Sequence, residues 1–129
     1  MSNELLVINV LPRESFNDCH INGSVHVPLT RLAEYAKSLD RNREIVVYCT
    51  SYVCSASREA WQLLKDMGFL AVFAYEGGMA EWFQKGLPSM GACKAEYLTK
   101  KHHEPTQVGH IQTISAQELE QKMQLAGLL

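Results

Sequence analysis

The stretch Ile45-Val46-Val47-Tyr48-Cys49 is the strongest guide to the fold. Three β-branched residues followed by an aromatic one predict a buried β-strand. Small polar residues follow. Apolar side chains at helical spacing then predict a helix from about residue 55 to 67, and Gly68 is suited to be its C-cap. Cys49 is therefore expected at the carboxyl end of a strand, in a loop that leads into a helix.

The same alternation extends to both sides of this unit. Apolar runs at residues 5–10, 25–27 and 70–75 predict further strands, and helices are expected at about 30–39, where Thr30 can act as the N-cap, and 79–85. Strands that alternate with helices indicate an α/β fold, in which a mainly parallel central sheet is flanked by helices on both faces. Ligands of such sheets bind beyond the carboxyl ends of the strands, which directs attention to the loop after Tyr48.

Composition indicates one globular domain with no large charge imbalance. The 129 residues are 47% hydrophobic, and 12 Lys and Arg against 14 Asp and Glu give a net charge of −2. These values predict neither a nucleic-acid partner nor a membrane partner. The longest apolar run, Phe69 to Tyr75, is far shorter than the ~20 residues that span a bilayer.

The amino-terminal residues do not have the pattern of a signal peptide, so a cytoplasmic location is expected, where thiols stay reduced. The cysteines at 19, 49, 54 and 93 are too few and too widely spaced to predict a disulfide scaffold. Cys19 and Cys93 are accordingly interpreted as bystanders.

Cys49 is the candidate nucleophile. Backbone N–H groups at the start of the following helix lack intrahelical partners, and their dipoles favour negative charge. A thiolate at residue 49 is therefore expected to have a lowered pKa, and a persulfide or a sulfur oxyanion is favoured for the same reason. Its position alone is equally typical of an inert buried cysteine. The loop residues expected to bind the substrate are Thr50, Ser51, Tyr52, Val53, Cys54 and Ser55.

Several motifs in order resemble the rhodanese-like superfamily. They are LLVINVLPRESFNDCHINGSVHVPL at residues 5–29, then IVVYC with its loop and helix, then GFLAVFAYEGGMAEWFQKGLP at residues 68–88. The resemblance covers about residues 5–90. It implies the fold described above, and it implies that Cys49 carries a persulfide while sulfur moves from a thiosulfate or persulfide donor to a thiol acceptor. That acceptor is a small molecule or a protein, and neither a metal nor an organic cofactor is expected.

The chain departs from the family pattern in the loop. The family usually has an arginine five residues after the cysteine and a glycine between them; this chain has Cys54 at that position and no glycine from 50 to 55. Asn9 stands where the family usually has aspartate. Related phosphatases need Cys-x5-Arg, and residue 55 is serine, so phosphate chemistry is not expected.

Cys54 has two open interpretations. It is either a resolving cysteine that attacks a modified Cys49, or a small residue that suits the start of a helix. The altered loop also supports an alternative function, that of a catalytically weak rhodanese-like module for binding, regulation or redox sensing.

The carboxyl-terminal part predicts an unusual organisation. Residues 1–90 form the expected body and residues 91–110 a polar linker, while residues 111–129 resemble the strand and helix with which rhodanese-like domains usually begin. We expect a strand at 111–114 and a helix at 116–125, opened by a capping box of Ser115 and Glu118, that complete the same domain. This makes a circular permutation, or a homodimer by tail exchange if the linker cannot reach. His102, His103 and His110 in or near the linker are expected to be solvated and to bind no metal.

Overall fold

A computed structural model describes residues 5–101 and 110–129. Its centre is a parallel sheet of four strands with the spatial order β3-β1-β4-β5. Their bounds are β1 Leu6–Asn9, β3 Val25–His26, β4 Ile45–Tyr48 and β5 Val72–Tyr75. Every residue of β1 and β4 is buried, which explains why these strands consist of continuous apolar runs with little alternation.

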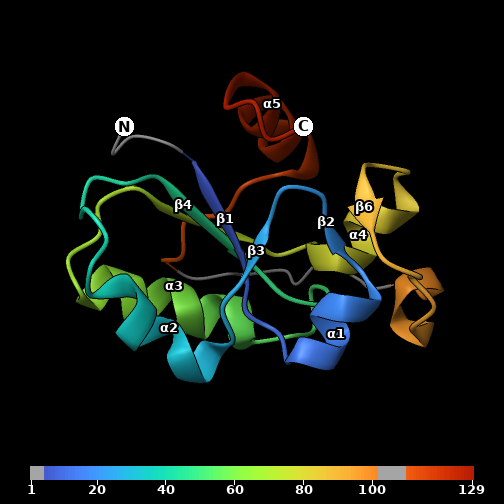
Figure 1. The fold of residues 1–129 in the computed structure, drawn as a ribbon, viewed down its shortest axis with the longest axis horizontal. Helices are drawn as coiled ribbons and strands as arrows, with labels where there is room; N and C mark the ends of the chain where they lie inside the picture. Colours follow the sequence, from blue (N-terminus) through green and yellow to red (C-terminus); the bar gives the residue numbers. More distant parts are fainter. Residues whose placement is uncertain (1–4, 102–109) are drawn as a thin grey trace.

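Helices cover both faces of the sheet, as the sequence predicted (Figure 1). Helices α2 (Leu29–Ala36) and α3 (Ala56–Asp66) pack on one face, while α4 (Gly78–Gln84) and α5 (Ala116–Leu125) pack on the other. Side chains of β1, β4 and β5 alternate between these two cores, because successive residues of a strand point to opposite faces.

Two parts of this arrangement correct the sequence-based expectations. Helix α2 begins at Leu29 with Pro28 as its N-cap, so Thr30 lies inside the first turn and is not the cap. The sequence also gave no indication of α1 (Arg13–Asp18) or of a second, antiparallel sheet formed by β2 (His20–Ile21) and β6 (Ser89–Met90). Elements this short leave no measurable periodicity.

The carboxyl-terminal segment docks on the sheet. In place of the expected strand at 111–114, an isolated parallel bridge joins Thr113 to Ala74 of β5. The Ala74 N–H donates to the Gln112 carbonyl at 2.9 Å, and the Ala74 carbonyl accepts from the Ile114 N–H at 3.2 Å. Helix α5 has the predicted bounds and the predicted capping box, and its Leu119 and Met123 are fully buried. Figure 1 places α5 on the side of the sheet opposite α2 and α3. It stays a prediction that residues 111–129 replace the strand and helix with which rhodanese-like domains usually begin. The exchange of tails between two chains also stays a prediction.

The first part of the predicted linker is packed against the domain. Residues 91–101 include a 3-10 helix, η1 (Glu96–Thr99), whose Leu98 is fully buried. The rest of the linker, with His102 and His103, lies outside the described residues. The packing was missed because the apolar residues here are isolated among charged ones.

Cys19 and Cys93 form a disulfide, which contradicts their interpretation as bystanders. The Asp18 carboxylate beside it accepts hydrogen bonds from the backbone N–H groups of Lys94 and Ala95 at 3.0 and 3.1 Å. A spacing of 74 residues gave no sign of this contact, because the fold alone brings the two segments together. Within residues 5–101 and 110–129, no helix has the length and apolar character needed to cross a bilayer.

The docking of α5 is testable with two matched substitutions in the same helix. Leu119→Ala removes a fully buried side chain and should lower the free energy of unfolding by about 2–5 kcal/mol. Leu125→Ala removes a side chain that is 91% exposed and should leave it nearly unchanged. Urea unfolding measures both, and equal effects would contradict the docking. Light scattering on the intact chain separates one-chain docking from an exchanged dimer.

The disulfide also has a measurable contribution. Because the disulfide closes a long loop, Cys93→Ser should lower the free energy of unfolding by roughly 2–4 kcal/mol relative to the wild type in the absence of reductant. The wild type should approach the stability of the variant when dithiothreitol is added, whereas the variant should not respond. A wild type that is insensitive to reductant would show that the bond contributes little.

Candidate active site

Cys49 lies where the sequence placed it, immediately after β4 and before the loop that leads into α3. Its side chain is almost completely buried, with 1% exposed. The sulfur lies 3.7 Å from the backbone carbonyl oxygen of Cys54 and 3.6 Å from Oγ of Ser57 in the first turn of α3. The loop and the helix start together enclose the thiol.

The loop is held against the turn between β5 and α4. The N–H groups of Met79 and Ala80 donate to the carbonyl oxygens of Cys49 and Thr50, both at 2.9 Å. Gly78 makes this approach feasible, since it has a φ of +64° and a Cβ there would lie 2.6 Å from the Cys49 carbonyl oxygen. The position of the cysteine thus depends on a residue that is distant in sequence.

A chain of polar groups extends from the sulfur into the protein. Ser57 is fully buried, and its hydroxyl donates to a Glu76 carboxylate oxygen at 3.0 Å. The other carboxylate oxygen lies 3.5 Å from the Arg58 guanidinium, so the charge of Arg58 is paired with that of Glu76. Burial raises the pKa of Glu76 above its usual value, although Ser57 and Arg58 oppose that shift. A buried carboxylate is thereby linked to Cys49 through one hydroxyl group.

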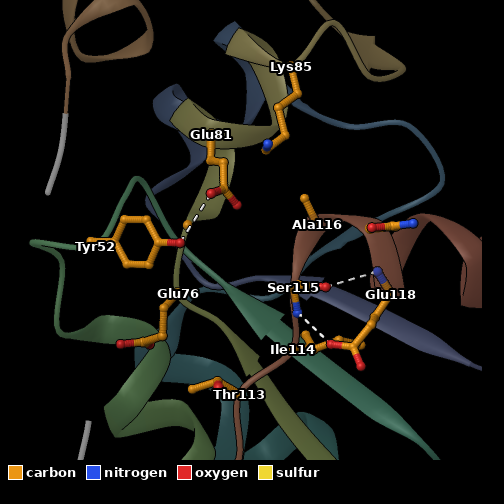
Figure 2. Close-up of a pocket in the computed structure, with 11 residues that line it drawn as sticks. Tyr52, Glu76, Glu81, Lys85, Thr113, Ile114, Ser115, Ala116 and Glu118 are labelled. Atoms are coloured by element: carbon orange, nitrogen blue, oxygen red, sulfur yellow. Dashed lines mark hydrogen bonds between the residues drawn. The ribbon is translucent and has the colours of Figure 1, made fainter. Parts of the chain in front are cut away.

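A pocket of about 420 Å³ lies beside this chain, between the loop, α4 and the start of α5 (Figure 2). The acidic and basic side chains of its lining are Glu76, Glu81, Glu118 and Lys85. The Tyr52 hydroxyl donates to Glu81 at 3.1 Å across the pocket. Neither Cys49 nor Cys54 is among its lining residues, so the pocket adjoins the thiol site and does not contain it.

The two cysteines of the loop shift each other's pKa in opposite directions. A hydrogen bond from the Cys49 thiol lowers the pKa of Cys54 to about 5, and backbone N–H groups of Ala56 and Thr50 act in the same direction. The same hydrogen bond, together with burial, raises the pKa of Cys49. The expectation of a lowered pKa at Cys49 is therefore wrong while Cys54 is reduced. The backbone dipoles exist, but they act mainly on the more accessible sulfur.

The other predicted loop residues fall into two groups. Ser51 is buried, and Tyr52 faces the pocket, where its hydroxyl meets Glu81. Val53 is 73% exposed and makes no part of an enclosed site. Ser55 lies on the surface, where its hydroxyl donates to Glu59 at 3.0 Å.

Asn9 retains part of the role expected of an aspartate. Its side-chain oxygen accepts the N–H of Leu11 at 2.9 Å, which supports the turn after β1. His110, the one described member of the histidine group, lies 2.9 Å from the Gln62 side-chain oxygen through Nε2.

Ser57 and Glu76 were not among the predicted site residues. In the sequence, Glu76 stands only within the family-like stretch at residues 68–88, and Ser57 only within the helix expected from about residue 55 to 67. The order of strands offered a signal for Glu76, since it follows β5 just as Cys49 follows β4, and the carboxyl ends of neighbouring parallel strands meet at one edge.

The rhodanese-like domain family matches residues 1–85, which is most of the chain. This chain belongs to the rhodanese-like family. Its fold and the position of Cys49 at the end of β4 agree with that membership. The rhodanese-like match ends before β6, η1 and the docked carboxyl-terminal segment.

Relatives of this rhodanese-like chain include an enzyme and a regulator. The thiosulfate sulfurtransferase GlpE of Shewanella oneidensis is 31% identical over 78 residues, which cover 60% of this chain and 75% of that protein. The HTH-type transcriptional regulator Rv0324 of Mycobacterium tuberculosis is 33% identical over 85 residues, which cover 66% of this chain but only 37% of the regulator. The crystal structure of the Rhodanese_3-like domain of the Anabaena Alr3790 protein matches with a TM-score of 0.61 at 32% identity, over 67% of this chain and 98% of that domain.

The proton distribution between the two thiols can be measured by alkylation. Thiolates react with iodoacetamide and thiols do not, so Cys54 should be labelled well before Cys49 at pH 7. The labelling rate of Cys54 should rise with pH to a plateau, with a midpoint near its pKa of about 5. Peptide mass spectrometry assigns the label. Faster labelling of Cys49 would reverse the assignment.

Proposed function

We propose that this rhodanese-like domain is a sulfurtransferase that carries sulfur as a persulfide on Cys49, from a thiosulfate or persulfide donor to a thiol acceptor. The observation that carries the proposal is the position of Cys49 at the end of β4, linked through Ser57 to the buried Glu76. A family relative named as a thiosulfate sulfurtransferase supports it.

The polar chain gives the first step a path for the proton. The Cys49 thiol transfers its proton through the Ser57 hydroxyl to the Glu76 carboxylate, and the resulting thiolate attacks the outer sulfur of the donor. The S–S bond of the donor breaks, and sulfite or a thiolate leaves with the bonding electrons. The raised pKa of Glu76 suits this role, since a carboxylate with a higher pKa holds a proton more readily.

Charge around the site favours a persulfide donor over thiosulfate. Arg58 is paired with Glu76, and the adjoining pocket presents the carboxylates of Glu76, Glu81 and Glu118 against the single ammonium group of Lys85. A dianionic donor approaching this surface meets net negative charge, whereas a persulfide of lower charge meets less repulsion.

A second function, that of a regulatory or redox-sensing module, has its own support. The transcriptional regulator among the relatives is 33% identical, and the candidate nucleophile of this chain is almost completely buried. The number of turnovers per protein molecule distinguishes the two functions. A module that senses a donor reacts once, whereas an enzyme releases product repeatedly.

The sulfurtransferase is tested by thiocyanate release from cyanide with thiosulfate and with a persulfide donor. Cys49→Ser should abolish turnover with both donors, and the persulfide should be the better substrate of the wild type. Absence of Cys49-dependent turnover with either donor would leave the regulatory function as the better one.

Glu76 is tested as a positioning residue of the same reaction. Glu76→Gln should slow turnover roughly a hundredfold, because the amide cannot accept the proton. The wild-type rate should rise with pH through the raised pKa of Glu76, and this rise should be lost in the variant. Glu34→Gln, which removes an exposed carboxylate of α2, is the matched control and should leave both rate and pH profile unchanged. An unaltered pH profile in Glu76→Gln would assign Glu76 a structural role only.

A further inference from the structure

Cys54 lies beside the proposed sulfur carrier and differs from it in accessibility. The backbone carbonyl oxygen of Cys54 is 3.7 Å from the Cys49 sulfur, and each cysteine shifts the pKa of the other. Cys54 is half-buried, whereas Cys49 is almost completely enclosed. Both residues belong to the short loop between β4 and α3. A bond between their sulfurs therefore requires movement of this loop and not of a strand or a helix.

The remaining cysteines are already paired with each other. All four cysteines of the chain lie in the described residues; Cys19 is bonded to Cys93, which leaves Cys49 and Cys54 as the free thiols. Any pair of electrons that the thiols of this chain supply to a bound sulfur must therefore come from these two residues.

We propose that Cys54 resolves the persulfide on Cys49, so that the domain reduces the transferred sulfur to hydrosulfide and is reset by an external dithiol. This inference rests on the proposed function, because it begins with the persulfide. It adds a further activity, in which sulfur leaves as sulfide and does not remain bound for delivery to an acceptor thiol.

The step balances within the site. The Cys54 thiolate attacks Sγ of Cys49, a disulfide forms between the two residues, and the bond from Sγ to the outer sulfur breaks. The outer sulfur leaves as HS⁻ with the proton of the persulfide. In this step the Cys54 sulfur is oxidised from the thiolate to the disulfide level and the outer sulfur is reduced to the sulfide level, while the Cys49 sulfur keeps its oxidation state. An external dithiol then exchanges with the new disulfide, becomes a disulfide itself and restores both thiols.

The charge state of Cys54 supports the direction of attack. In the resting site the Cys49 thiol lowers the pKa of Cys54, and hydrogen bonds from the backbone of Ala56 and Thr50 lower it further. The backbone groups stay in place when Cys49 carries a persulfide, and they continue to favour the Cys54 thiolate. The family resemblance places an arginine at this position, where its charge would hold the persulfide. This chain instead places a nucleophile there, which suits release of the sulfur better than its retention.

A single-turnover experiment tests the inference without any external thiol. The full chain is incubated with thiosulfate or a small organic persulfide, freed of excess donor, and assayed for sulfide by methylene blue and for mass by peptide mapping. We expect the wild type to release close to one equivalent of sulfide and to contain a Cys49–Cys54 disulfide. Cys54→Ser should release none and should keep 32 Da, one sulfur atom, on Cys49. Cys54→Ala is a second variant in case the serine perturbs the loop.

Two further measurements identify the source of electrons and the reset. A double variant, Cys19→Ser with Cys93→Ser, should still release one equivalent, because the other cysteine pair takes no part. With dithiothreitol, the wild type should release sulfide over many turnovers.

The outcomes distinguish the two proposals. A wild type that keeps the added sulfur on Cys49 and releases no sulfide overturns the resolving role but retains the sulfurtransferase. If Cys49 acquires no sulfur in either Cys54 variant, the sulfurtransferase proposal itself fails. Sulfur found on Cys54 in a Cys49→Ser variant would place the first step on the other thiol and overturn both.

Discussion

The close approach of the β5–α4 turn to the loop after β4 is the constraint on which the site depends. The carbonyl oxygens of Cys49 and Thr50 accept hydrogen bonds from N–H groups in the first turn of α4. This contact requires a residue with positive φ and no Cβ at position 78. The same turn carries Glu76, so one backbone contact sets both the place of the thiol and the distance of the carboxylate from Ser57. Neighbouring parallel strands thus deliver the nucleophile and its polar support to one edge of the sheet.

The chemistry of the loop follows from which of its two cysteine sulfurs carries the negative charge. An enclosed sulfur is poorly solvated as a thiolate, whereas a half-buried sulfur that faces backbone N–H groups is well stabilised. Cys54 therefore holds the charge and Cys49 the proton. Once Cys49 carries another sulfur, its S–H donor is gone, and the two residues are no longer related by the hydrogen bond that sets their resting state.

Much of this architecture could be predicted from the sequence, and the exceptions have common physical causes. The strand Ile45–Tyr48 and the helix Ala116–Leu125 were predicted with their observed bounds, because a continuous apolar run and a capping box are strong local signals. The Cys19–Cys93 disulfide and the Ser57–Glu76 hydrogen bond join residues far apart in the chain and leave no local signal. The sequence predicted a lowered pKa for Cys49, whereas its pKa is raised. The backbone dipoles follow from local sequence, but the burial that raises the pKa depends on how the loop closes.

The bridge between Thr113 and Ala74 has a consequence for how the polypeptide is synthesised. Residues 112–114 emerge from the ribosome after all four strands of the sheet they join. During that interval the outer edge of β5 presents unpaired N–H and C=O groups, and the apolar surface later covered by α5 faces water. The nascent chain consequently passes through a stage with an open sheet edge, at which pairing with the same edge of a neighbouring nascent chain competes with completion of its own fold.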